Sequence, residues 1–180
     1  LTVFQRTANY CVPAGNGPID AETQLKIKGS YPEIWKRCSE TFVCFLHGFD
    51  DRSALEVSPE TRQAFYEELY QERGFALWLG NFADIMTNNE ANETLAEFIR
   101  EKIHARIDDP KVAGKLVPMD HAFGTKRVPL EHGYYEAYNR ENVALVDIRA
   151  TPIEEITAKG VRTTAAEYES DIIIYATGFD

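Results

Sequence analysis

The chain has 180 residues, of which 44% are hydrophobic and 12% aromatic, enough for one substantial domain with a buried core and not typical of a disordered segment. Its formal net charge of −10 and pI of about 4.9 argue against a nucleic-acid-binding or anionic-membrane surface, because both need a basic face. The sequence also contains no apolar run of about 18 residues that could span a membrane.

The cysteines and histidines favour neither a disulfide framework nor a metal site. Cys11, Cys38 and Cys44 are odd in number and form no CxxC pair, and the histidines lack the paired spacing of metal ligands. Reduced thiols are typical of the cytoplasm. We therefore expect a cytoplasmic protein without a bound metal.

The first expected element is a strand at residues 1–5, where β-branched and aromatic residues lead into Arg6 and Thr7. Residues 8–30 are rich in Gly, Pro and Asn, which predicts an irregular connection. The chain begins without Met and inside an apolar run, so we expect it to be part of a longer protein.

A block of helices is expected over residues 30–117. Ser30 can cap a first helix that has Pro32 in its first turn and continues to Gly48. A second helix is predicted over residues 58–74, because a Ser-Pro pair opens this segment and a glycine closes it.

The longest helix of the block should begin at the capping box Thr87-Asn88-Asn89-Glu90, after a short apolar turn at residues 75–81. Asp109-Pro110 should then cap a short helix that ends at Leu116. Amphipathic helices of this kind predict packing rather than chemistry. The apolar stripe of the long helix consists of Ala91, Leu95, Phe98, Ile99, Ile103 and Ile107.

Strands are expected again after the block. Residues 134–139 predict one or two helical turns, and residues 143–147 a buried strand. Residues 153–156 and 161–164 flank Lys159-Gly160, which predicts a hairpin. The apolar run at 172–176 is typical of a parallel strand buried on both faces. The predicted order is therefore strand, helical insertion and strands.

Lys126 and Arg127 are adjacent cations in a predicted loop, between the flexible Gly124 and the stiff Pro129. In an acidic chain this pair is a candidate anion site. The alternative is an ordinary basic loop in contact with solvent.

Arg6 and Thr7 directly follow the first strand. In a doubly wound nucleotide-binding fold this position recognises the adenosine ribose. An arginine there favours a 2′-phosphate, because a guanidinium can hold the phosphate through two parallel hydrogen bonds. A plain exposed arginine is the alternative.

Two further patterns give weaker evidence for a functional site. Ala176-Thr177-Gly178 follows the last apolar run, where a glycine can simply end a strand. None of the serines lies in a GxSxG context, so hydrolase chemistry has no support.

In their order and spacing, four stretches resemble the middle of a Baeyer–Villiger monooxygenase of the cyclohexanone-monooxygenase type, a family of FAD- and NADPH-dependent enzymes. These stretches are residues 1–7, residues 123–129, Gly133-Tyr134-Tyr135 and residues 172–180. The resemblance extends over nearly the whole chain. It implies an α/β fold: part of a doubly wound NADP-binding domain with a largely helical insertion, from a flavoprotein that has two dinucleotide-binding domains.

The resemblance also implies a role for each candidate residue. It places Lys126 near the NADPH 2′-phosphate, beside Arg6 and Thr7. Arg127 matches the family's catalytic arginine, a fixed cation that stabilises the anionic flavin C4a-peroxide and then the tetrahedral adduct with the ketone. Thr177 and Gly178 match a segment where the backbone approaches the flavin cofactor.

For the domains, the resemblance implies an NADP-domain strand and loop at 1–29, a helical insertion at 30–117, NADP-domain strands with the active-site loop at 118–165, and a strand that returns to the FAD domain at 166–180. The full protein would insert one oxygen atom of O2 into a ketone to give an ester or lactone. We expect these 180 residues alone to be inactive.

One departure from the family is Ala8, which stands where the family has a proline, so ribose and phosphate recognition is expected to be looser. The family's glycine-rich nucleotide turns are also absent from these residues. Two alternatives remain open: an N- or S-oxidising flavin monooxygenase, and a noncatalytic helical interaction module.

Overall fold

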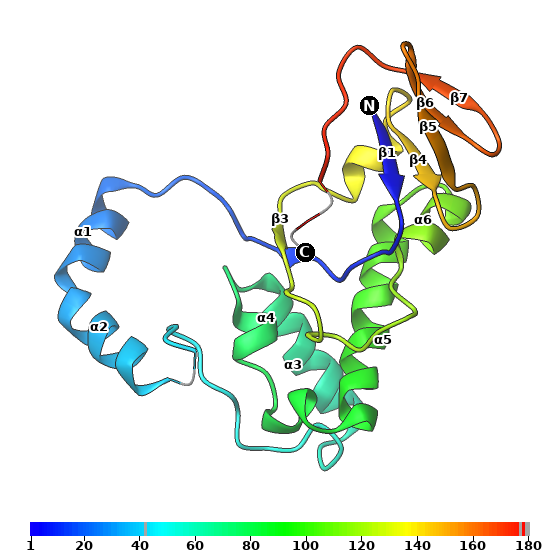
Figure 1. The fold of residues 1–180 in the computed structure, drawn as a ribbon. Coiled ribbons are helices and arrows are strands. Elements are labelled where there is room, and N and C mark those ends of the chain that lie inside the picture. The colour runs from blue at the N-terminus through cyan, green and yellow to red at the C-terminus, as the bar shows by residue number, and fades with distance from the viewer. Residues whose placement is uncertain (42, 177, 179–180) are drawn as a thin grey trace.

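Two short parallel pairs of strands bracket the helices of this protein. The computed structural model describes residues 1–41, 43–176 and 178. β1 (Thr2–Gln5) pairs with β4 (Ala144–Asp147), and β2 (Val12–Pro13) pairs with β3 (Leu130–Glu131). Strands from before the helical block thus meet strands from after it (Figure 1), which confirms the predicted order.

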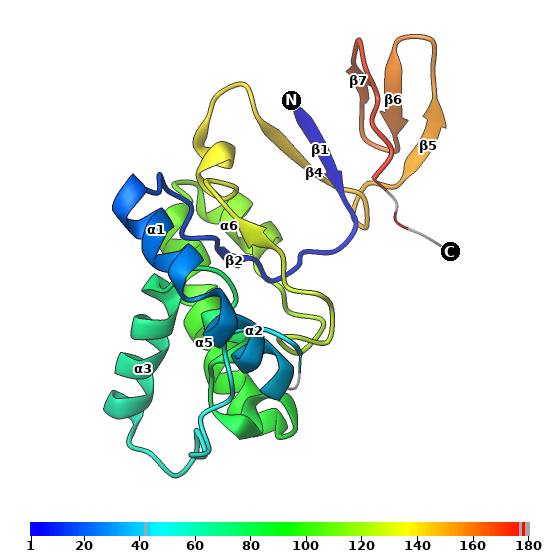
Figure 2. The same cartoon turned by 90° about the vertical axis from the view of Figure 1, so that its left-hand side faces the viewer.

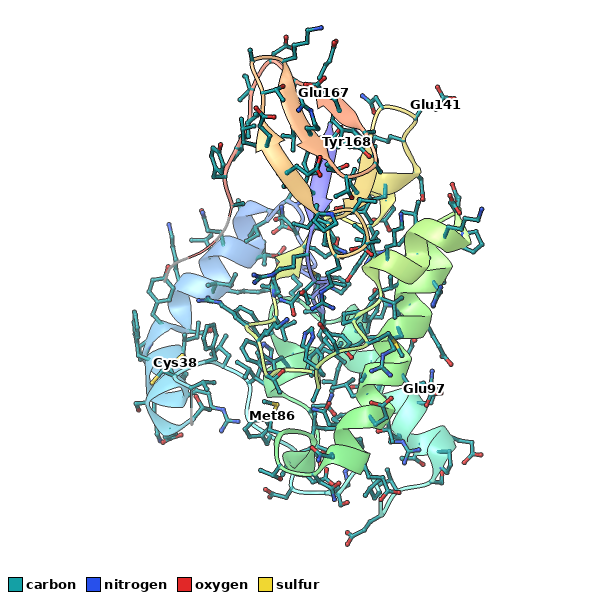
Figure 3. The ribbon with its side chains drawn as sticks, turned by 45° about the vertical axis from the view of Figure 1, so that its right-hand side comes forward. Cys38, Met86, Glu97, Glu141, Glu167 and Tyr168 are labelled. Carbon is teal, nitrogen blue, oxygen red and sulfur yellow. The ribbon has the colours of Figure 1, made fainter. Side chains whose placement is uncertain are left out.

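A three-stranded antiparallel sheet follows: β5 (Ile153–Ile156), β6 (Gly160–Thr163) and β7 (Glu167–Glu169). The predicted hairpin is confirmed, and β7 was not predicted. A Cβ atom on Gly160 would collide with the carbonyl of Tyr168, so this turn requires glycine. Tyr168, labelled in Figure 3, packs edge-on against Phe4 of β1 with ring centroids 5.3 Å apart.

The helical block buries most of the core. It contains α3 (Pro59–Gln71), α4 (Ala76–Leu79), the 3-10 turn η1 (Ala83–Met86), α5 (Asn89–Arg106) and α6 (Pro110–Leu116). The predicted stripe of α5 is confirmed, since all six of its residues are buried. The cap of α6 is confirmed too, because Asp109 accepts a hydrogen bond from the backbone N–H of Lys111 at 2.8 Å.

The predicted capping box of α5 is wrong by one residue. Asn88 is the N-cap, and its Oδ1 accepts from the N–H groups of Glu90 and Ala91. Thr87 caps the end of η1, where its hydroxyl and its N–H both donate to the Asp84 carbonyl. The preceding turn therefore takes Thr87, which leaves the cap to an asparagine.

The prediction for residues 8–48 needs two corrections. α1 (Ala21–Gly29) forms inside the segment expected to be irregular, because Asp20 caps it by accepting from the N–H of Thr23 at 2.7 Å. α2 (Tyr31–Glu40) ends well before Gly48, because Thr41 has an extended backbone. Ser30 occupies the N-cap position of α2, but its hydroxyl donates to the Lys26 carbonyl of α1 instead.

α1 and α2 lie beside the body of the molecule, as Figures 1 and 2 show, and neither helix has a buried residue. The apolar spacing of α2 therefore buries no side chain fully against the described residues.

The later segments agree with prediction only in part. A 3-10 turn, η2 (Glu136–Asn139), and β4 form where a helical turn and a strand were expected, but Val146 is the only residue of β4 classed as buried. Residues 172–176 form no strand, and Ile172 and Ile174 are 79% and 84% exposed. A strand needs a neighbour for its backbone groups, and none of the described residues supplies one. No helix within the described ranges is long and apolar enough to cross a membrane.

Candidate functional site

The parallel pairing of β1 with β4 brings the candidate residues after β1 close to a second basic residue. Gln5 lies opposite Asp147, so Arg6 and Thr7 leave the sheet at the same edge as Ile148 and Arg149. Arg149 donates from Nη2 to the hydroxyl of Thr7 at 2.8 Å. Carboxyl ends of adjacent parallel strands are where α/β folds bind ligands.

Asp120, which follows α6 at the end of the helical block, bonds to the same arginine. Its Oδ2 accepts from Arg149 Nη2 at 2.8 Å, and its Oδ1 lies 2.7 Å from Nδ1 of His121. These bonds, first with His121 and then with Arg149, together with the charge of Lys126, lower the pKa of the Asp120 carboxyl to about 2. The carboxylate is therefore ionised near neutral pH and holds Arg149 in place.

Lys126 and Arg127 project from a loop held between two buried residues. Phe123 and Val128 are each 1% exposed, whereas both cations are exposed. Asn9 donates from Nδ2 to the carbonyl of Arg127 at 3.0 Å, which ties the loop to the segment just after Thr7. Within the described ranges, neither cation makes a side-chain hydrogen bond or ion pair.

The structure thus brings together only some of the predicted site residues. Thr7 bonds Arg149, which pairs with Asp120, and Lys126 influences Asp120 through its charge alone. Arg127 is tethered to Asn9 through its carbonyl. Arg6 is exposed and pairs with no described side chain. Gly178 is exposed with a φ of +84°, and no contact between it and this cluster is observed in the described part of the chain. Thr177 lies outside the described residues.

The sequence analysis missed Arg149. It follows the strand expected at 143–147, just as Arg6 follows the strand at 1–5. The signal was therefore an arginine at the carboxyl end of each strand. It becomes informative only when the two strands are known to be parallel neighbours, which their separation in the sequence does not show.

The charge balance of this cluster suits an anion. Arg149 pairs with Asp120, while Lys126, Arg127 and Arg6 form no ion pair within the described residues, so positive charge exceeds negative charge among these five side chains. A guanidinium, an ammonium and a hydroxyl together can donate to a phosphate monoester from several directions. Among the residues that the structure describes, no group of three His, Cys, Asp or Glu side chains could hold a metal ion.

Two hollows open on the surface of the described part of the chain. One, of about 310 Å³, is lined mainly by residues 14–19 and includes Arg73 and His132. The other, of about 290 Å³, lies between η1 and residues 122–125. Neither hollow is lined by Lys126 or Arg127, so the basic pair faces open solvent.

No family model matches the chain. Curated relatives do match, over its entire length. The 2-oxo-Δ3-4,5,5-trimethylcyclopentenylacetyl-CoA monooxygenase of Pseudomonas putida is 49% identical over 180 residues, and a Baeyer–Villiger monooxygenase of Pseudooceanicola batsensis is 45% identical over 184 residues. In each case the alignment covers 100% of this chain and 33% of the relative.

Solved structures agree with the curated relatives. The crystal structure of OTEMO in complex with FAD and NADP matches with a TM-score of 0.97 and 49% identity, over 99% of this chain and 33% of that one. The chain thus spans about a third of the length of the proteins it matches. On both sequence and structure, it belongs to the Baeyer–Villiger monooxygenases.

Proposed function

We propose that these residues form the NADP side and the helical insertion of a monooxygenase that uses FAD, NADPH and O2 to convert a ketone into an ester or lactone. The observation that carries the proposal is that Arg149 binds both Thr7 and Asp120 at the edge of the β1–β4 pair, with the charge of Lys126 acting on the same carboxylate. The likeness to the FAD- and NADP-bound OTEMO structure supports it.

The finer architecture belongs to the same proposal. Residues 1–29 and 118–165 would be parts of a doubly wound NADP-binding domain, with residues 30–117 inserted between them. Residues 166–180 would return to an FAD-binding domain, whose sheet would supply the partner that residues 172–176 lack here. The likeness in fold to whole flavoprotein monooxygenases supports this division.

The cluster fits the 2′-phosphate of NADPH. Lys126 contributes an ammonium, Arg149 and Arg6 contribute guanidinium groups, and Thr7 contributes a hydroxyl. Asp120 orients Arg149 without neutralising the whole cluster, because the cations outnumber it. A phosphate monoester carries close to two negative charges, so it gains more from this cluster than a ribose hydroxyl does.

Arg127 suits the reacting centre better than the phosphate. Bound FAD would supply the activation of O2. Arg127 is one residue beyond Lys126 on the same tethered loop, and it brings a guanidinium cation to that position. A fixed cation of this kind stabilises the negative oxygen that develops when the ketone carbonyl is attacked.

Turnover of the full-length protein tests the proposal. Wild type should convert a cyclic ketone to its lactone at the expense of NADPH. Arg127→Ala should retain FAD but form lactone at least roughly a hundredfold more slowly, since loss of one group that stabilises an oxyanion costs about that much. Lactone and hydrogen peroxide are measured together.

Arg140→Ala is the matched control, since Arg140 is also exposed and its side chain pairs with no described residue. This variant should oxygenate the ketone like wild type. If wild type oxidises amines or sulfides but no ketone, the reaction proposed here is wrong. If Arg127→Ala is fully active, the role of Arg127 is wrong.

A further inference from the structure

Asn92 on α5 holds the backbone of Phe123 by both of its polar groups. Asn92 Nδ2 donates to the Phe123 carbonyl at 2.9 Å, and Asn92 Oδ1 accepts from the Phe123 N–H at 2.9 Å. Nδ2 also donates to the carbonyl of Ile85 in η1 at 2.9 Å. Asn92 is only 5% exposed, so its amide joins α5, η1 and residue 123 away from water.

The geometry of this contact is selective for asparagine. One edge of a planar amide presents a donor and an acceptor side by side, which matches the N–H and C=O of a single residue. A carboxylate of the same shape would place negative oxygens against the carbonyls of Ile85 and Phe123. A fully satisfied buried network of this kind orients the groups it joins, whereas an incomplete one is costly.

The basic loop begins directly at this contact. The Phe123 ring is buried and packs edge-on against Tyr10 with ring centroids 5.5 Å apart. Gly124 has a φ of +83°, and a Cβ atom there would lie 2.8 Å from Cε of Met86. Met86, labelled in Figure 3, lies at the end of η1, the same turn that Asn92 holds through Ile85. The direction in which the chain leaves Phe123 is therefore set from α5 and η1.

The other end of the loop is held independently. Asn9 binds the Arg127 carbonyl, and the N–H of Val12 donates to the Pro129 carbonyl at 3.1 Å. Lys126 and Arg127 thus lie between an anchor on the strand side and the anchor made by Asn92. Their own side chains make no hydrogen bond or ion pair among the described residues, so the backbone anchors set their position.

We propose that Asn92 is a positioning residue for Lys126 and Arg127. Its amide fixes the start of the loop so that both cations reach their ligands. This inference rests on the proposed function for one point: that the ligands of Lys126 and Arg127 are the NADPH phosphate and the reacting oxygen. Asn92 touches neither cation and acts through Phe123.

Asn81 offers a matched control. It is a buried asparagine at 0% exposure, its Nδ2 donates to the Leu77 carbonyl at 2.9 Å, and its Oδ1 accepts from the Phe82 N–H at 2.8 Å. Asn81→Ala therefore removes the same kind of amide contact from the same helical block without touching residues 122–131. Its cost in stability should resemble that of Asn92→Ala.

The test compares wild type, Asn92→Ala, Asn92→Asp and Asn81→Ala in the full-length protein. We expect hydrogen exchange of residues 122–127 to accelerate in both Asn92 variants and to stay unchanged in Asn81→Ala. Both Asn92 variants should bind NADP⁺ more weakly and release more hydrogen peroxide per lactone, with bound FAD retained. The yield of lactone should fall roughly tenfold or more, since misplacing a reacting group by about 1 Å can cost a hundredfold.

Three results would overturn the inference. The first is unchanged exchange of the loop in the Asn92 variants. The second is a looser loop with unaltered NADP⁺ affinity and peroxide release. The third is that Asn81→Ala loses as much NADP⁺ affinity and lactone yield as the Asn92 variants do, when its melting temperature falls by the same amount. If wild type oxygenates no ketone, the proposed function fails, and the exchange and NADP⁺ measurements still decide whether Asn92 positions the loop.

Discussion

At the scale of single residues, neighbours in the sequence can have distinct tasks because of what lies around them. The charge of Lys126 contributes to the lowered pKa of the Asp120 carboxyl, whereas Arg127 is held by a contact to its backbone carbonyl. The two cations therefore differ in the partners available to them. This difference leads us to assign the phosphate to Lys126 and the reacting oxygen to Arg127.

The assignment of Lys126 predicts a change in coenzyme preference. Lys126→Ala should raise the KM for NADPH by roughly tenfold or more and leave that for NADH nearly unchanged, because a hydrogen bond to a charged group contributes about 1.5–3 kcal/mol. Steady-state kinetics with both coenzymes measure this. Lys111→Ala, at an exposed lysine of α6, is the control and should change neither value. Equal losses with NADPH and NADH would show that Lys126 does not contact the 2′-phosphate.

At the scale of elements, the half-buried Arg106 links the helical block to the segments that follow it. Arg106, in the last turn of α5, donates from Nη1 to Glu131 of β3 at 2.8 Å and from Nη2 to Glu136 of η2 at 2.8 Å. It also lies over the ring of Tyr135, 5.0 Å from the centroid. The Glu131 side chain is 5% exposed, so its charge depends on Arg106 for compensation.

Removal of Arg106 should therefore be costly. Arg106→Met should destabilise the protein by about 3–5 kcal/mol, because it leaves Glu131 charged and buried without its partner. Arg106→Met combined with Glu131→Gln should recover part of this loss. Thermal and urea denaturation measure both changes. Lys26→Met breaks the fully solvated pair with Glu22 and should cost far less; a comparable loss in that control would contradict the prediction.

The elements also show where sequence patterns mislead. The apolar spacing after Ser30 continues past Glu40, yet α2 ends there because Thr41 turns to an extended backbone. Thr87 fits a capping box but is taken by the preceding turn. In both places the sequence pattern was compatible with a helix, but the backbone at the boundary residue, extended at Thr41 and bonded to the preceding turn at Thr87, set the helix limit.

At the scale of the whole molecule, a strongly acidic chain depends on a few carboxylates that are held ionised. The pKa of Asp50 is lowered to about 2 by hydrogen bonds from the side chain and backbone of Arg52, and that of Asp120 is lowered to about 2 by His121 and Arg149. A folded pKa below the unfolded value of about 3.9 means that these contacts stabilise the fold above roughly pH 4. Their contribution is lost as the pH falls toward 2.

We therefore expect the melting temperature to fall between about pH 4 and pH 2, and to fall less steeply in Asp50→Asn and Asp120→Asn. Calorimetry across this pH range measures the slopes. Asp51→Asn, at an exposed carboxylate without an ion pair among the described residues, should keep the wild-type slope. If all three variants share one slope, the two contacts do not contribute to acid stability.

The sequence by itself determined much of this protein: the order of strand, helical insertion and strands, the apolar stripe of α5, the cap of α6, the hairpin at Gly160 and the family resemblance. These features depend on local periodicity, turn chemistry and short motifs, which act between residues close in the chain. The sequence also identified Lys126 and Arg127 as a candidate anion site, because they are adjacent cations in an acidic chain.

Only the tertiary structure decided which distant residues meet. Arg149 reaches Thr7 across 142 positions, and Asn92 reaches Phe123 across 31. Such contacts depend on strand pairing and helix packing, which no local pattern encodes. The same reason explains residues 172–176: an apolar run predicts a buried strand, but only a neighbouring strand makes it one, and the described residues supply none.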